Sequence, residues 1–508
     1  MAKQTILISV WDKSGLVEFL GALKKKTELR LIATGSTGDY LKENGFACEA
    51  VSDITQFPEI LDGRVKTLHP KVFGGILAKD TPEHRETLEA HQIPEIDMVI
   101  CNLYPFEAKL IENLPEDKMI EFIDIGGVSL LRAAAKNFSR VAICSQQVHY
   151  SLVLEQFNNN EVPRPLRKQL AQEAFAQTTR YDAAISGYLT QGSEKSVFPQ
   201  TIQQTFHKVQ DLRYGENPQD AGAWYNTSPS ELPFTCLQGK ELSYNNLLDI
   251  HAAYHLVREF GDAPACCIIK HGNPCGVAIA DDIETAYQRA FEADSISAFG
   301  GIIAINRPAT QKLAELLNQQ FAEIVIAPSF SEDAKQTFSS KKNLRLIEFP
   351  RFDGQADSEL RFRDLSPIGV LLEAPSTEAS QAFEVVTKTP IPERLVQQSR
   401  FAWAVVKHLR SNAIVVANDG VTLGMGMGQT SRISSTLHAL EQAGQRAEGA
   451  VLASDGFFPA TDNIEAMAKA GISVIIQPGG SMKDSDVIAA ADQQGIAMAF
   501  THKRCFKH

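Results

Sequence analysis

Short apolar runs alternate with amphipathic stretches along most of this chain, and that alternation constrains its fold more than any other feature. Within residues 1–145, ILISV is followed by SGLVEFLGALKKK, LRLIATG by STGDYLKENG, and IDIGG by VSLLRAAAKN. Alternating strand and helix signals of this kind predict a parallel β-sheet flanked by helices, an α/β fold. Because such sheets bind ligands at the carboxyl ends of their strands, functional residues are expected where the strands end.

Two domains are expected from the length of the chain and from a polar stretch near residue 195. The 508 residues exceed what one hydrophobic core usually organises. Residues 161–190 lack strand signals and indicate helix, and QGSEKSVFPQTIQQ at 191–204 is the best candidate boundary. We therefore predict an N-terminal domain over residues 1–195, with its α/β core in 1–145, and a C-terminal domain over residues 196–508.

The C-terminal region continues the alternation of strand and helix and contains a short internal echo. Runs such as ACCIIK, GGIIAIN and AVLASDG are typical of strands. The segment Lys270-His271-Gly272-Asn273 resembles Lys407-His408 followed by Asn412. This echo fits two subdomains of similar fold, and it fits a chance recurrence of common residues about equally well.

Composition excludes several classes of protein. No apolar run approaches the ~18 residues that cross a bilayer, and MAKQTILISVWDKSG lacks the features of a signal peptide, so a cytoplasmic location is expected. The eight cysteines form no C-x-x-C pair and are expected to be reduced thiols, mostly buried. A net charge of -12 argues against a general affinity for nucleic acid.

Three predicted strand-to-helix junctions in the N-terminal domain, at residues 9–14, 34–37 and 124–127, are rich in small and hydroxyl residues. Free backbone N–H groups at a helix start attract anions, and glycine lets the backbone approach them closely. A simple N-cap or turn explains any one junction. Three junctions at one sheet edge favour a phosphate pocket, although none has the spacing of a dinucleotide-binding or P-loop motif.

Between the second and third junctions, DGRVKTLHP at 62–70 combines two cations, a hydroxyl and a histidine, a composition that a solvated loop could also have. Together with CNLYPF at 101–106 and DIGGVSLLRAAAKN at 124–137, it resembles the inosine monophosphate (IMP) cyclohydrolase domain, which has a methylglyoxal-synthase-like fold. The resemblance implies that Lys136 donates and accepts protons, assisted by Lys66, Tyr104 and Asp124. It implies substrate binding by Asp12, Lys13, Ser14, Thr34, Gly35, Ser36, Thr37, Arg64, Val65, Thr67, Cys101, Asn102, Ile125, Gly126 and Gly127.

The implied reaction is attack of a carboxamide nitrogen on a neighbouring formyl carbon, followed by loss of water. Both groups belong to one substrate, so the enzyme has to fold that substrate, stabilise the oxyanion and move protons. The alternative function is a regulatory nucleotide sensor, because methylglyoxal-synthase-like domains also serve in that role. The loop with Arg64, Lys66 and Thr67, together with Tyr104 and Lys136, argues against the sensor.

In the C-terminal domain, Lys270 and His271 follow the apolar run ACCII and enter a turn. A histidine there can accept a proton at neutral pH, and an adjacent ammonium can donate one or hold an oxyanion. A lone histidine at a strand end is more often structural. The motifs around it favour a catalytic role for this histidine over a structural one. They are KHGNPCGVA, LRYGENP (212–218), DSISAFGGIIA (294–304), GQTSRI (428–433), SDGFFPATDN (454–463) and the basic C-terminus.

These motifs resemble, in chain order, aminoimidazole-carboxamide ribonucleotide (AICAR) formyltransferase, whose domain is a pair of cytidine-deaminase-like α/β subdomains. The resemblance to the fused formyltransferase/cyclohydrolase covers nearly the whole length of the chain. The resemblance implies 10-formyltetrahydrofolate as formyl donor, no metal, a homodimer, His271 as the base and Lys270 as its assistant. It implies nucleotide binding by Arg213, Tyr214, Gly300, Glu323, Asn412, Arg432 and Arg504, and folate contacts by Phe299, Ile433, Phe457, Asp462, Ser481, Met482 and Phe506.

The chain departs from the family pattern in two places and from a rival pattern in one. Gln219 stands where the family often has histidine, and Glu323 stands where some relatives have aspartate. A zinc deaminase is the nearest rival enzyme, because Pro274-Cys275 begins a P-C-x-x-C motif. Position 278 is Ala278, so the second thiolate of that motif is missing.

The last eight residues, THKRCFKH, are basic in an acidic chain. A terminal charge run is usually a frayed, solvated tail. The preceding GIAMAF is typical of a strand that would tie the end to a sheet, and a guanidinium suits a bound phosphate. We therefore expect Arg504 and Phe506 to complete the formyltransferase site.

Overall fold

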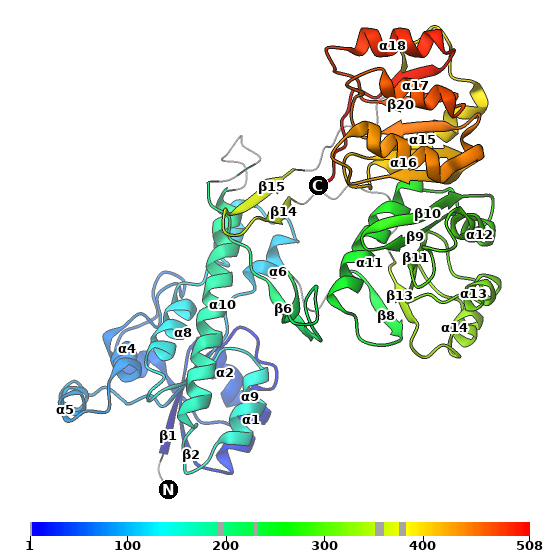
Figure 1. Ribbon diagram of the computed structural model, residues 1–508. Helices are drawn as coiled ribbons and strands as arrows, with labels where there is room; N and C mark the ends of the chain where they lie inside the picture. The colour runs from blue at the N-terminus through cyan, green and yellow to red at the C-terminus, as the bar shows by residue number, and fades with distance from the viewer. Residues whose placement is uncertain (1–2, 191–197, 199, 228–231, 351–359, 375–382) are drawn as a thin grey trace. The chain divides into compact units, whose positions relative to one another are not determined.

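The computed structural model describes residues 3–190, 198, 200–227, 232–350, 360–374 and 383–508 (Figure 1). The chain divides into two compact units, residues 1–205 and 206–508. The boundary expected near residue 195 lies outside the described residues.

Unit 1 contains a five-stranded sheet in the order β3-β2-β1-β4-β5, and all of its strand pairs are parallel. The parallel α/β sheet expected from the alternating pattern is therefore confirmed. The strands are β1 (Lys3–Ser9), β2 (Glu28–Ala33), β3 (Glu49–Ala50), β4 (Met98–Cys101) and β5 (Ala142–Cys144). The central strand β1 is apolar and buried from Ile6 to Ile8, because helices cover both faces of the sheet.

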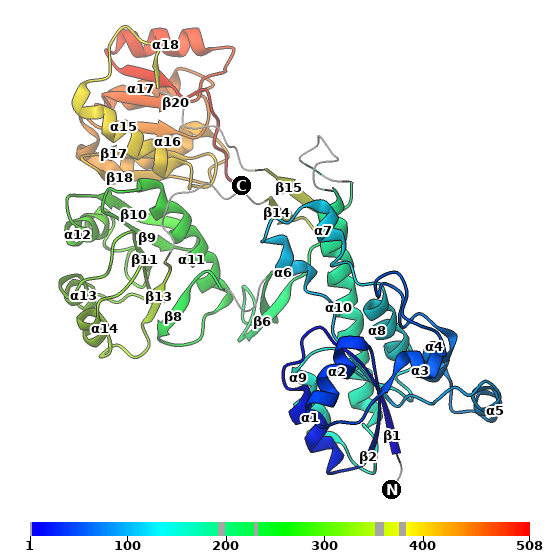
Figure 2. The same ribbon diagram turned by 180° about the vertical axis from the view of Figure 1, so that it is seen from behind.

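The helices of unit 1 lie on both sides of this sheet, α1 and α2 on one side and α4 and α8 on the other (Figure 2). The long helix α10 agrees with the helical region expected over residues 161–190. The helices are α1 (Leu16–Lys24), α2 (Gly35–Glu43), α3 (Val51–Thr55), α4 (Pro70–Leu77), α5 (Pro82–Ala90), α6 (Phe106–Leu110), α7 (Glu116–Ile120), α8 (Gly126–Lys136), α9 (Val148–Gln156) and α10 (Arg164–Thr190).

Unit 2 is built on a 12-stranded sheet in the order β16-β21-β20-β19-β17-β18-β10-β9-β11-β12-β13-β8. Its strands are β8 (Thr235–Gln238), β9 (Ala265–Lys270), β10 (Asn273–Ile279), β11 (Ile302–Ile305), β12 (Ile324–Ala327), β13 (Arg345–Glu348), β16 (Glu384–Val385), β17 (Ile414–Asn418), β18 (Val421–Gly426), β19 (Val451–Ser454), β20 (Val474–Gln477) and β21 (Ala497–Phe500). Two hairpins stand apart from it, formed by β6 (His207–Leu212) with β7 (Gly222–Asn226) and by β14 (Arg361–Asp364) with β15 (Val370–Glu373).

The helices of unit 2 form two sets, one in each half of the unit. In both sets the helices alternate with strands in the same order along the chain. The first set is α11 (Tyr244–Val257), the short 3-10 helix η1 (Arg258–Phe260), α12 (Ile283–Ala293), α13 (Gln311–Asn318) and α14 (Glu332–Phe338). The second set is α15 (Glu393–Val406), α16 (Arg432–Ala443), the 3-10 helix η2 (Gly444–Ala447), α17 (Asp462–Lys469) and α18 (Asp484–Gln493).

Unit 2 consists of two halves with the same order of helices and strands, an internal repeat. The order α11-β9-β10-α12-β11-α13-β12-α14-β13 recurs as α15-β17-β18-α16-β19-α17-β20-α18-β21, and the sheet order is symmetric about the antiparallel β10–β18 pair. The packing repeats as well. A Cβ at Gly276 on β10 would lie 1.9 Å from the carbonyl oxygen of Ala290, and one at Gly424 on β18 would lie 2.0 Å from that of Ala439. The expectation of two subdomains of similar fold is therefore confirmed.

The sequence echo does not mark the repeat. Lys270 and His271 lie where β9 turns into β10, whereas Lys407 and His408 follow the end of α15, before β17 begins. The positions equivalent to Lys270 and His271 are Asn418 and Asp419, at the turn between β17 and β18. The echo is thus a chance recurrence, and the repeat is carried by topology.

Two candidate active sites

A cavity of about 550 Å³ lies at the carboxyl ends of β1, β2 and β4 in unit 1. The loop with DGRVKTLHP and the start of α8 close its other sides. Of the predicted residues it is lined by Lys13, Thr34, Ser36, Thr37, Arg64, Lys66, Thr67, Asn102, Tyr104, Asp124, Ile125, Gly126 and Gly127. The three predicted junctions therefore meet at one edge of the sheet.

Asn102, which lines this cavity, links the segment after β4 to the segment after β1 by hydrogen bonds. Its Oδ1 accepts hydrogen bonds from the backbone nitrogens of Trp11 at 2.6 Å and Asp12 at 3.1 Å, and its Nδ2 donates to the carbonyl oxygen of Asp12 at 2.7 Å. Asp12 itself accepts hydrogen bonds from the side chain and backbone of Ser14, which lower its pKa. Asp12 and Ser14 thus shape the junction without lining the cavity.

Asp124 lies two residues before α8 and contacts its first turn. Its Oδ1 accepts a hydrogen bond from the backbone nitrogen of Gly127 at 2.7 Å, and a Cβ at Gly127 would lie 2.3 Å from its Oδ2. Only glycine leaves room for this carboxylate. Burial raises the pKa of Asp124, against the opposing effects of the Gly127 N–H and of the Lys66 ammonium. A carboxyl with a raised pKa beside a lysine is suited to proton transfer.

Three residues in or beside this cavity, Glu59, Glu121 and Trp11, were not predicted from the sequence. Glu59 accepts a hydrogen bond from the backbone nitrogen of Gly35 at 3.4 Å, at the start of α2, and Glu121 pairs with Arg64. A phosphate bound there would have to displace these carboxylates. Trp11 packs edge-on against Tyr104, with ring centroids 5.1 Å apart, and adds an aromatic wall.

Five predicted binding residues of unit 1 lie beside the cavity rather than in its lining: Asp12, Ser14, Gly35, Val65 and Cys101. Cys101 is buried on β4 with its Sγ 3.7 Å from the carbonyl oxygen of Gly127, and burial raises its pKa well above the ordinary value. It supports the start of α8 through packing.

Lys136 is not brought to this cavity. It is the last residue of α8, whose first residues line the cavity, so the helix places it about 15 Å away along the axis. There it lines a separate groove with Phe73, Phe138 and Phe175. Within one chain, the catalytic role implied for Lys136 therefore has no support from geometry.

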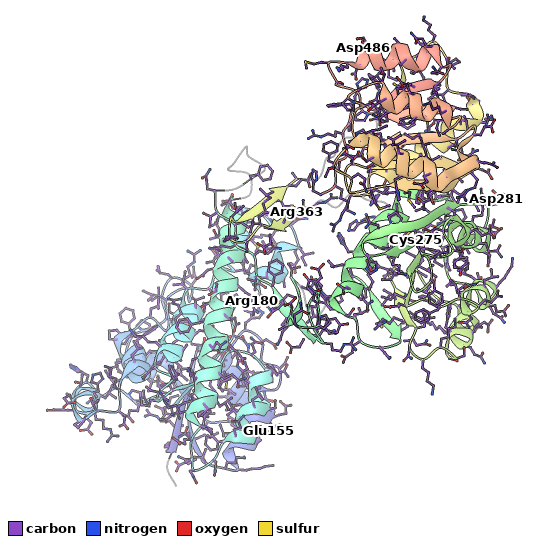
Figure 3. The ribbon with its side chains drawn as sticks, in the orientation of Figure 1. Glu155, Arg180, Cys275, Asp281, Arg363 and Asp486 are labelled. Atoms are coloured by element: carbon purple, nitrogen blue, oxygen red, sulfur yellow. The ribbon has the colours of Figure 1, made fainter. Side chains whose placement is uncertain are left out.

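In unit 2, a cavity of about 480 Å³ contains Lys270 and His271, together with Cys275, Asp294 and His438. Lys270 Nζ donates to the carbonyl oxygen of Phe299 at 2.9 Å. Cys275, labelled in Figure 3, is buried on β10, and burial raises its pKa to about 11. Among the described residues, no group of three or more His, Cys, Asp or Glu side chains is placed so that it could hold a metal ion.

Glu323 and Gly300 lie beside Lys270 on the same edge of the sheet. Glu323 accepts a hydrogen bond from Asn246 Nδ2 at 3.2 Å, and its backbone nitrogen donates to the carbonyl oxygen of Gly301. Gly300 has φ 74, a conformation that favours glycine. Arg213 and Tyr214 follow β6, with Arg213 Nη2 donating to Tyr214 Oη at 2.9 Å.

A second group of predicted residues surrounds the start of α16. Arg432 is buried and donates to Asp455 at 2.5 Å, Ser454 at 2.8 Å and Asn412 Oδ1 at 2.7 Å. Its guanidinium is thus engaged within the protein. The other predicted contacts around this sheet edge are Ile433, Phe457, Asp462, Ser481 and Met482, of which Phe457, Asp462 and Met482 are exposed.

The C-terminal segment is fastened to this second group. The backbone nitrogen of Cys505 donates to the carbonyl oxygen of Asp455 at 3.1 Å, and that of Ser411 donates to the carbonyl oxygen of Lys507 at 2.9 Å. The guanidinium carbon of Arg504 lies 4.4 Å from the centroid of the Phe506 ring. Arg363 on β14 (Figure 3) donates to the carbonyl oxygen of His508. The tail is docked rather than frayed.

The two groups lie on the same edge of the 12-stranded sheet but not in one cavity. Gly300 and Glu323 precede β11 and β12, and Asn412 precedes β17. Four to five strand spacings, about 19–24 Å, separate them along the edge. One chain therefore presents two separate groups of predicted residues along this edge.

No helix in the described part of the chain is both long and apolar enough to cross a membrane. All eight cysteines are free thiols, and five of them are buried.

Comparison with known proteins gives consistent matches. The model of the AICARFT/IMPCHase bienzyme family matches residues 134–442, and that of the MGS-like domain matches residues 15–129. The proteins named bifunctional purine biosynthesis protein PurH from Desulfitobacterium hafniense, strains DCB-2 and Y51, are 46% identical to this chain over 517 residues. The protein of that name from Listeria welshimeri is 46% identical over 514 residues. Each of these alignments covers 99% of both chains.

Among solved structures, the crystal structure of ForH matches with a TM-score of 0.31 and 32% identity, covering 37% of this chain and 100% of ForH. The assignment rests on the sequence matches over almost the whole chain and on the parallel sheet of unit 1. This chain belongs to the AICARFT/IMPCHase bienzyme family and is a bifunctional enzyme of purine biosynthesis, with formyltransferase and cyclohydrolase activities.

Proposed function

We propose that unit 2 transfers a formyl group from 10-formyltetrahydrofolate to AICAR and that unit 1 closes the formylated product to IMP. The observation that carries this proposal is that each unit holds its own cavity, lined by the motif that resembles the corresponding enzyme. The domain boundary proposed near residue 195 separates the two activities. The cavity of unit 1 is lined by Lys66, Tyr104 and Asp124. We propose catalytic roles for these three groups, which a nucleotide sensor does not need.

Ring closure in unit 1 joins the carboxamide nitrogen to the formyl carbon and then releases water. The Lys66 ammonium would stabilise the oxyanion that forms on the formyl oxygen. Tyr104 and Asp124 would move protons between the nitrogen and the departing hydroxyl. The helix starts at Gly35 and Gly126 would orient the 5′-phosphate end of the substrate. Lys136 enters this proposal only through family resemblance.

Formyl transfer in unit 2 forms a bond between the exocyclic amine of AICAR and the formyl carbon, and it breaks the bond from that carbon to the folate nitrogen. His271 would accept the proton that the amine loses. Lys270 would stabilise the tetrahedral intermediate or protonate the departing folate nitrogen, giving tetrahydrofolate. No metal takes part in these steps as we propose them.

We further propose a cytosolic homodimer, in which each formyltransferase site combines the half-site with Lys270 and His271 of one chain with the half-site around Asn412 of the other. The separation of the two half-sites within one chain supports this arrangement.

Co-expression tests the homodimer. His271→Ala and Arg504→Ala are each expected to remove formyl transfer when expressed alone. A mixed dimer of the two variants would hold one intact site, so it should recover about a quarter to a half of the parent activity per dimer. Co-purification with two different tags isolates the mixed dimer. A mixed dimer as inactive as either variant would contradict a shared site.

Deletion of residues 501–508 is expected to remove formyl transfer and to leave ring closure intact. Arg504 and Phe506 are held at the second half-site by the Cys505 and Lys507 backbone contacts, so the deletion removes an exposed guanidinium together with its support. Separate ultraviolet assays of the two reactions check this. If a truncated, folded chain formylated AICAR with the parent kcat and KM, residues 501–508 would not be part of the formyltransferase site.

A further inference from the structure

The internal repeat of unit 2 allows the turn that carries His271 to be compared with an equivalent turn in the same molecule. Both are two-residue turns between antiparallel strands, one between β9 and β10 and the other between β17 and β18. His271 and Gly272 have φ 54 and 72, and Asp419 and Gly420 have φ 49 and 70. The two turns therefore share one backbone conformation, with positive φ at both central residues.

Each turn is fastened by the helix that precedes it. The backbone nitrogen of Gly272 donates to Asp249 Oδ1 at 2.6 Å, and that of Gly420 donates to Gln398 Oε1 at 2.5 Å. Asp249 is the sixth residue of α11 and Gln398 the sixth residue of α15, and both helices have 14 residues. The acceptor thus occupies the same place in both repeats, but it is charged in one and neutral in the other.

This difference separates the structural need from the chemical one. Gln398 shows that a neutral amide oxygen is sufficient to hold the turn. The turn of the second repeat carries Asp419, whose carboxylate pairs with Arg289 Nη2 at 2.7 Å. The turn of the first repeat carries His271, and its helix places a carboxylate where the other has an amide. Holding the turn therefore does not by itself require the charge on Asp249.

We propose that Asp249 is a positioning residue for formyl transfer, which holds the His271 turn and balances the positive charge that His271 gains on accepting the amine proton. A carboxylate that orients a histidine base and stabilises its protonated form is a recurring arrangement in acid–base catalysis. Burial raises the pKa of Asp249, while the Gly272 N–H and nearby His271 favour its ionised form. The proposal rests on the base role of His271.

Neighbouring residues of α11 bind the other parts of the same half-site. Asn245 Nδ2 donates to the carbonyl oxygen of Glu216 at 3.1 Å, in the loop after Tyr214, and Asn246 Nδ2 donates to Glu323 Oε2 at 3.2 Å. A single helix therefore fixes the loop after β6, the carboxylate predicted to bind nucleotide and the catalytic turn. The sequence motifs do not single out this helix.

The test compares three variants of the full-length chain. Asp249→Asn keeps an acceptor for the Gly272 N–H and removes the charge, and Asp249→Glu keeps the charge. Gln398→Ala removes the equivalent hydrogen bond of the second repeat and serves as the matched control. The measurements are kcat and KM for AICAR and for 10-formyltetrahydrofolate, the melting temperature, and ring closure as an internal check of folding.

We expect Asp249→Asn to lower kcat for formyl transfer by about tenfold or more, with KM for AICAR within about twofold and ring closure unchanged. Asp249→Glu should recover part of the loss, and Gln398→Ala should keep the parent kcat. Equal kcat for Asp249→Asn and the parent, or equal losses in Asp249→Asn and Gln398→Ala, would overturn the proposal. If His271→Ala instead retained formyl transfer, the proposed function of the site would be wrong, so the two failures are distinguishable.

Discussion

Replacing Lys66 by alanine in the full-length chain is expected to lower kcat for ring closure by about 10²-fold or more, because the oxyanion would lose its cationic partner. Lys66 lines the cavity of unit 1 and its charge acts on the half-buried carboxyl of Asp124, so the proposed proton-transfer pair is disturbed as well. The measurement is the ultraviolet assay with the formylated nucleotide as substrate. Formyl transfer by the same preparation should equal that of the parent.

Lys79→Ala is the matched control, because Lys79 is an exposed lysine of unit 1 outside the cavity. It should close the ring at the parent rate. A parent rate of ring closure in Lys66→Ala would show that this cavity is not the cyclohydrolase site.

His271→Ala is expected to show the reverse pattern, with formyl transfer reduced by about 10²–10⁴-fold and ring closure unchanged. The amine of AICAR is a poor nucleophile, because its lone pair delocalises towards the neighbouring carboxamide, and it needs a base at the moment of attack. His271 has φ 54, and asparagine tolerates that conformation better than alanine does. His271→Asn therefore tests the same loss with less strain on the turn. Parent-like formyl transfer in both variants would show that another group is the base.

Local patterns in the sequence predicted much of the fold and part of each candidate site. The parallel sheet of unit 1 follows from runs such as ILISV, and the helix starts at Gly35 and Gly126 follow from small residues after predicted strands. The residues of DGRVKTLHP and the Lys270-His271 pair were proposed as site residues because the contiguous motifs that contain them resemble those of a known family; their composition alone also fits a solvated loop or a structural turn. These features depend on neighbours along the chain, which the sequence displays directly.

Features that depend on distance in space were not predictable in the same way. Lys136 belongs to the same motif as Asp124, but a helix between them separates their side chains. Glu59 and Asp249 contact backbone nitrogens of segments distant in sequence, and nothing in their local sequence marks these contacts. The Lys407-His408 echo suggested a repeat that exists, but at positions that the topology does not make equivalent.

The central claim, two separable active sites on one chain, is tested most directly by following conversion of AICAR and 10-formyltetrahydrofolate to IMP. Lys66→Ala should accumulate the formylated nucleotide, His271→Ala should leave AICAR unreacted, and an equimolar mixture of the two purified variants should form IMP. Loss of both half-reactions in either variant, with the protein still folded and IMP absent from the mixture, would contradict the account.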